Sequence, residues 1–130
     1  RTVDVIKHVI ERLINCIGFG LEALLKYAKE KKLVTIIPAN AGLRCDLLKK
    51  TFPDNLELID YINFYLRLRK LSRAEYTRRE EFRRHVTMIA TIDKGEVVEV
   101  SIDSLKEDYG KTRNFIAFVK KIINEEKEEN

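Results

Sequence analysis

The sequence predicts a mainly α-helical single domain over residues 1–130, folded as an antiparallel up-and-down helical bundle of four to five helices with a β-hairpin insertion at about 86–102. In several long segments apolar residues recur every three to four positions, which is typical of amphipathic helices. Between 86 and 102 they alternate with polar residues instead, which indicates strands. A chain of 130 residues also matches one domain with one core.

The first helix is predicted from Thr2 to about Lys31. Gly18 and Gly20 interrupt it, and each costs about 1 kcal/mol against alanine in a helix interior. They therefore mark either a kink or a close helix crossing, and we favour the crossing. The apolar stripe of this helix consists of Ile6, Ile10, Leu13, Ile17, Leu21, Leu24 and Ala28.

An extended connector is expected over residues 33–37, because the residue before Pro38 is pushed away from helical geometry. A short helix then opens at Asn40 or Ala41 and stops before Pro53.

Asp54 or Asn55 is placed to cap the next helix, which continues toward Arg73 with a possible break at residues 71–72. The strands of the hairpin follow, joined by the turn 93–95, and Asp103 or Ser104 is expected to cap the final helix.

The composition excludes a disordered chain, because 45% of the residues are hydrophobic. The 35% of charged residues exceeds the roughly 25% of an average domain and resembles the composition of proteins from thermophiles. No apolar run approaches the ~20 residues needed to span a bilayer. We expect a soluble, cytoplasmic protein with no membrane partner.

Cys16 and Cys45 lie far apart, and neither belongs to a metal-binding pattern. Buried free thiols are expected, with an internal disulfide as the alternative in a hyperthermophile. No Gly-rich phosphate loop or nucleophile motif occurs. The sequence therefore predicts no metal and no cofactor.

Positive charge is concentrated between residues 67 and 84. This segment holds eight basic and three acidic residues, a net charge of +5, whereas the whole chain carries +4. A local positive patch attracts phosphate, and aromatic rings within it can stack on bases. The predicted nucleic-acid-binding residues are Arg67, Arg69, Lys70, Arg73, Tyr76, Arg83 and Arg84, with Phe82 as a second ring.

The alternative is that these arginines lie on a solvated helix and pair with Glu75, Glu80 and Glu81 at helical spacing. His85 favours a functional role, because it stands at the junction of the basic helix and the hairpin. The other histidine, His8, is expected to be a boundary residue of the first helix.

An arginine and a histidine together can perform phosphodiester chemistry without a metal. The guanidinium binds phosphate oxygens, and an imidazole with a pKa near 6.5 moves a proton at the 2′-hydroxyl or the leaving oxygen. The candidate catalytic residues are Arg78, Arg79 and His85. On a continuous helix Arg78 shares a face with His85, whereas a break before His85 favours Arg79.

On these residues the chain resembles the HEPN superfamily, helical bundles built on two long antiparallel helices, many of which carry an arginine followed after four to six residues by a histidine. The resemblance implies a metal-independent endoribonuclease of toxin-antitoxin or defence systems, acting as a homodimer whose two motifs face each other. Members without the motif serve as partners of nucleotidyltransferases, which implies such a partner protein as an alternative.

Two functions from different classes follow. The first is an RNA-binding or RNA-cleaving HEPN-like domain. The second is a non-enzymatic helical interaction module that binds a nucleotide or an acidic partner protein, and a structural bundle without a ligand remains a third. The sequence leaves the substrate, the partner and the biological role open.

Overall fold

The computed structural model describes residues 3–81 and 85–129, with the backbone alone for residues 80, 81, 85 and 126–129. Within these ranges the chain is mainly helical with one small antiparallel sheet, as predicted. Over residues 3–81 and 85–129, no helix has the length and apolar character needed to cross a membrane. The elements are α1 (Val3–Glu30), α2 (Ala41–Thr51), α3 (Leu56–Arg73), β1 (Glu75–Glu81), β2 (His85–Ile92), the short turn η2 (Asp93–Gly95), β3 (Glu96–Val100) and α4 (Ile102–Glu129).

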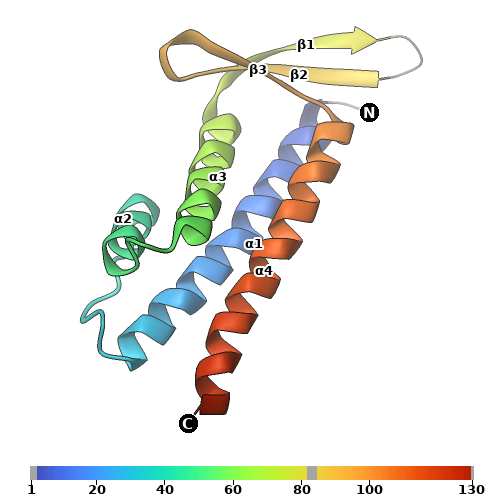
Figure 1. Cartoon of the computed structure of the whole chain (residues 1–130). Coiled ribbons are helices and arrows are strands. Elements are labelled where there is room, and N and C mark those ends of the chain that lie inside the picture. The colour runs from blue at the N-terminus through green and yellow to red at the C-terminus, as the bar shows by residue number, and fades with distance from the viewer. Residues whose placement is uncertain (1–2, 82–84, 130) are drawn as a thin grey trace.

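The sheet covers one end of the helices (Figure 1). From that end α1 and α4 run side by side in the same direction, while α3 runs back toward the sheet. The short α2 lies beside the start of α3. Consecutive long helices are therefore antiparallel, but the two longest helices are parallel, whereas the HEPN resemblance implies two long antiparallel helices.

The core is built on the apolar stripe of α1, as its periodicity predicts. Ile6, Ile10 and Ile17 are at most 1% exposed. From α4, Phe115 is fully buried and packs against Tyr61 of α3, with ring centroids 5.1 Å apart. Buried residues of α1, α3 and α4 therefore share one core.

Gly20 marks a close crossing, which confirms one part of the glycine prediction. A Cβ atom at Gly20 would lie 2.5 Å from Cε2 of Phe115, so α4 packs directly against the backbone of α1 there. A Cβ atom at Gly18 would lie 3.6 Å from Oη of Tyr65, an ordinary contact distance. Only Gly20 is thus required by packing, and α1 continues unbroken through both positions.

Side-chain caps begin three of the helices. Asn40 accepts a hydrogen bond from the Leu43 N–H, and Asn55 accepts one from the Leu58 N–H, as expected. The prediction for α4 is wrong, because its cap is Ser101. The N–H groups of Ser101 and Ser104 each donate to the other residue's hydroxyl, which satisfies the N–H of the cap residue and one free N–H of the first turn.

The predicted hairpin is confirmed as β2 and β3, but the sheet has a third strand. β1 pairs with β2 from Glu75–Thr91 to Glu81–His85, in a segment for which the charge spacing predicts a helix. That prediction is wrong because Ala74 adopts an extended conformation (φ −71°, ψ 151°) and ends α3. The ladder to β2 then supplies the backbone hydrogen bonds that a helix would have made.

The two cysteines differ in exposure. Cys45 is buried as expected, whereas Cys16 is exposed on α1. Both are free thiols, so the disulfide alternative is wrong.

Candidate nucleic-acid interface

The basic segment is divided between a helix and a strand. The C-terminal half of α3 carries Arg67, Arg69, Lys70 and Arg73, and β1 carries Tyr76, Arg78 and Arg79. Because α3 ends at Arg73, the argument that places Arg78 and His85 on one helix face does not apply. Phe82, Arg83, Arg84 and the side chain of His85 lie outside the described residues.

The strand register separates the two candidate arginines. Arg78 lies opposite Met88, which is fully buried against the helices, whereas Arg79 lies opposite Thr87 on the alternate side of the ladder. In the same register His85 lies opposite Glu81, two positions from Thr87 and therefore diagonal to Arg79. The backbone thus places positions 79 and 85 near each other.

Three of the predicted cations form ion pairs with carboxylates of the β2–β3 hairpin. Nη2 of Arg67 lies 2.9 Å from Oε2 of Glu96, Lys70 pairs with Asp93, and Arg79 pairs with Glu99. All six side chains are about half exposed, so each pair contributes little to stability. These partners are not the Glu75, Glu80 and Glu81 that helical spacing predicts; they lie far away in the sequence.

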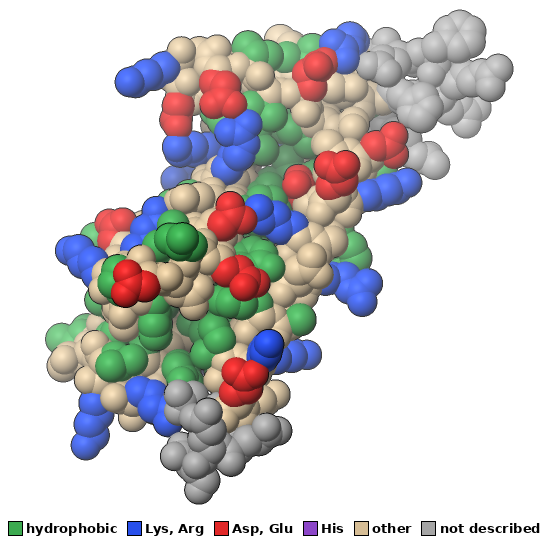
Figure 2. Space-filling model, in the orientation of Figure 1, with side chains coloured by type: hydrophobic (Ala, Val, Ile, Leu, Met, Phe, Trp, Pro, Cys, Tyr) green, Lys and Arg blue, Asp and Glu red, His purple; other side chains and the backbone are tan. Residues whose placement is uncertain are grey.

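Arg69 and Arg73 differ from these three residues. Within the described part of the chain neither forms an ion pair, and the guanidinium of Arg69 lies over the ring of Tyr65, 5.6 Å from its centroid. Figure 2 shows positive and negative side chains interspersed over the visible face. Three of the cations discussed above lie beside carboxylates. Because Arg69 and Arg73 form no ion pair among the described residues, their guanidiniums are well placed to bind an external anion.

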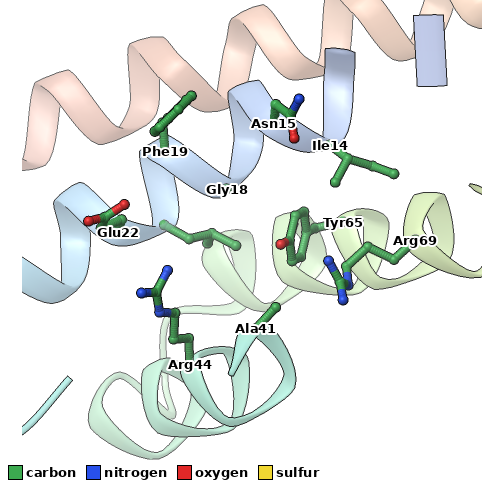
Figure 3. A pocket seen from close by; sticks show the side chains of 10 residues that line it. Ile14, Asn15, Gly18, Phe19, Glu22, Ala41, Arg44, Tyr65 and Arg69 are labelled. Atoms are coloured by element: carbon green, nitrogen blue, oxygen red, sulfur yellow. The ribbon is translucent and has the colours of Figure 1, made fainter. Parts of the chain in front are cut away.

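Surface hollows lie on both sides of α3, and Arg69 lines three of them. The first lies between α1, α2 and α3, where Figure 3 shows Arg44 and Arg69 flanking Tyr65. The second, between α1 and α3, is lined by Arg69, Ser72 and Arg73 together with Glu11 of α1. The third lies on the other side, toward η2, and is again lined by Arg69 and Arg73.

Sequence reasoning missed two cations of this region. Arg44 belongs to α2, and its Nε donates a hydrogen bond to the Pro38 carbonyl at 2.6 Å, which holds the side chain beside the first hollow. Lys7 of α1 lies over the ring of Tyr76, 4.9 Å from its centroid. Neither stands near the basic segment in the sequence, so no local signal identifies them.

Tyr76 is available for a stacking contact, because 42% of it is exposed. Lys7 occupies one side of the ring and adds a positive charge beside it. His8 is also exposed on α1.

Among residues 3–81 and 85–129, no group of three or more His, Cys, Asp or Glu side chains is arranged to hold a metal ion. The resemblance to HEPN domains stays a prediction. Compared with protein-family models, curated proteins and solved structures, the chain matches none.

Proposed function

We propose that this domain binds RNA through the basic surface formed by the C-terminal half of α3 and by β1. The observation that carries the proposal is that Arg69 and Arg73 form no ion pair in the described part of the chain and border hollows on both sides of α3. Guanidiniums bind phosphate oxygens bidentately, and release of counterions from a nucleic acid drives such binding.

The exposed ring of Tyr76 supports a single strand as the ligand. Base stacking on an aromatic side chain contributes about 1–3 kcal/mol per base and requires an unpaired base. Tyr76 follows Arg73 by three residues, just past the end of α3, so a strand lying along the guanidiniums of α3 reaches this ring.

The test compares Arg73→Ala with Arg113→Ala in binding of a labelled single-stranded RNA at several salt concentrations. Arg113 is the matched control, because it is an exposed arginine of α4 that lines none of these three hollows. Arg73→Ala is expected to weaken binding about fivefold and to reduce the salt slope by about 0.7, the value for one lost contact to a single strand. Binding that does not weaken with salt, or equal losses in both variants, would contradict the proposal.

RNA cleavage without a metal is a second candidate, favoured by the diagonal register positions of Arg79 and His85. In this reaction His85 takes the proton of the 2′-hydroxyl, the 2′-oxygen bonds to phosphorus, and the bond from phosphorus to the 5′-oxygen breaks. The guanidinium of Arg79 stabilises the charged phosphate, and the imidazolium of His85 returns the proton to the leaving 5′-oxygen. Cleavage would be measured in EDTA. Arg79→Ala and His85→Ala are expected to abolish it, while Arg78→Ala, on the opposite side of the ladder, retains it. Intact RNA after incubation with the wild-type protein would rule this candidate out.

A further inference from the structure

The third hollow lies where the first turn of α2, the C-terminal half of α3 and η2 meet. Its lining includes Asn40, Gly42, Arg69, Lys70, Arg73 and Asp93. With a volume of about 530 Å³, it falls within the usual size of small-molecule sites.

The charge of this hollow is positive. Arg69 and Arg73 are one helical turn apart, so their side chains leave α3 on the same face. The one carboxylate in the lining, Asp93, is already paired with Lys70. The charges of Arg69 and Arg73 are therefore not balanced within the lining.

The backbone at the start of α2 adds to the positive electrostatic potential of the hollow. Gly42 lies in the first turn and presents no side chain to the hollow, and the turn contains no acidic residue. The first N–H groups of a helix carry a partial positive charge. They reinforce the two guanidiniums, which by themselves define the site.

The remaining lining is apolar and consists of Leu66, Ala74 and Ile92. A lining that contains both cations and apolar groups matches the two parts of a nucleotide, the phosphate and the ribose with its base. An inorganic ion would leave the apolar part of the hollow unused.

We propose that this hollow binds a phosphomonoester attached to a nucleoside, either as a free mononucleotide or as the 5′ end of an RNA. A terminal phosphate carries roughly −1.5 to −2 charges at neutral pH, whereas each diester of the backbone carries about −1, so two guanidiniums favour the terminal group. The inference rests on the proposed function, because both use Arg69 and Arg73.

The first experiment measures binding of AMP, adenosine and two otherwise identical RNA oligonucleotides with a 5′-phosphate or a 5′-hydroxyl. AMP is expected to bind at least about tenfold more tightly than adenosine, and the 5′-phosphate to increase RNA affinity by a similar factor. Competition between AMP and the phosphorylated RNA then shows whether the free mononucleotide or the 5′ end of the RNA binds more tightly. Equal affinities for AMP and adenosine would overturn the proposal.

The second experiment compares Gly42→Asp with Gly42→Asn. Both add a side chain of nearly the same shape, and the new Cβ atom lies 3.2 Å from Oδ1 of Asn40 in each, so the negative charge is the main difference between them. An aspartate in the first turn favours the helix, and thermal unfolding checks that the variant folds. Gly42→Asp is expected to bind AMP at least about tenfold more weakly than Gly42→Asn. Equal AMP affinities of the two variants would overturn the proposal.

The 5′-hydroxyl RNA separates this inference from the proposed function. If it binds with a clear salt dependence but the 5′-phosphate adds nothing, the phosphomonoester site is wrong and RNA binding stands. If the 5′-hydroxyl RNA does not bind, the proposed function fails, and the comparison of AMP with adenosine alone decides the phosphomonoester site.

Discussion

Gly20 allows α1 and α4 to approach more closely than any side chain would permit, and Gly18 provides a matched control two residues away. Gly20→Ala is expected to lower the free energy of unfolding by about 1–3 kcal/mol, because the new methyl group overlaps Phe115. Gly18→Ala has room beside Tyr65 and is expected to raise it by up to about 1 kcal/mol. Urea denaturation followed by circular dichroism measures both, and equal stabilities would contradict the close crossing.

The two thiols are expected to differ in reactivity. Burial raises the pKa of Cys45 to about 11, although Lys49 and Arg69 act in the opposite direction, so the thiol stays protonated at neutral pH. A disulfide reagent should modify Cys16 rapidly and Cys45 only after unfolding. Cys16→Ser is the control and should remove the rapid phase. Two rapidly reacting thiols in the native protein would show that Cys45 is accessible.

At the level of elements, the turn that follows α1 contains a residue with an unfavourable backbone conformation. Lys32 adopts φ 62°, in the left-handed region that glycine enters without cost, and the next N–H, that of Leu33, bonds back to Ala28. Lys32→Gly is therefore expected to raise the free energy of unfolding by about 1 kcal/mol. Lys29→Gly, within the helix, should lower it by about the same amount. Denaturation midpoints that shift in one direction for both variants would contradict this assignment.

The helices could be predicted because their burial follows a local period. Ile10 and Ile17 repeat at helical spacing, and both are buried. β1 could not be predicted in this way, because apart from Tyr76 its residues are polar or charged and show no alternation of apolar and polar side chains. Its conformation depends on β2, which follows later in the chain, and local helical charge spacing carries no information about that pairing.

Only part of the candidate site could be predicted, because a sequence shows local patterns but not tertiary contacts. The local charge excess identified Arg69 and Arg73, because both belong to one continuous basic segment. It could not show that Arg67 pairs with Glu96, or that Arg44 comes close to Arg69. Those relations arise from tertiary packing, which brings α2 and the hairpin against α3.

For the molecule as a whole, Asp108 links stability to pH. Burial is the main cause that raises its pKa above 3.8, and repulsion by Glu107 adds to it, while Lys111 and Arg67 act in the opposite direction. The folded state then binds this proton more tightly than the unfolded state. Its contribution to stability is therefore present below the unfolded pKa and decreases as the pH rises through the folded value.

Asp108→Asn removes this titration. We expect the variant to gain stability relative to the wild type as the pH rises from acidic to neutral, as measured by urea unfolding across a pH series. Glu107→Gln, at an exposed neighbouring position, is the comparison and should show a smaller change. A difference between Asp108→Asn and the wild type that is constant with pH would show that Asp108 titrates alike in both states.

The side-by-side packing of α1 and α4 joins two elements that lie far apart in the sequence. During synthesis α1 leaves the ribosome before Phe115 has been made. α3 can cover part of the apolar stripe of α1 first, but the part that α4 covers stays exposed to water until α4 has emerged. Contacts between the two ends of a chain form late, because a long loop must close before they stabilise anything. A nascent chain that ends at the sheet would therefore expose the unfinished core to chaperones and to aggregation.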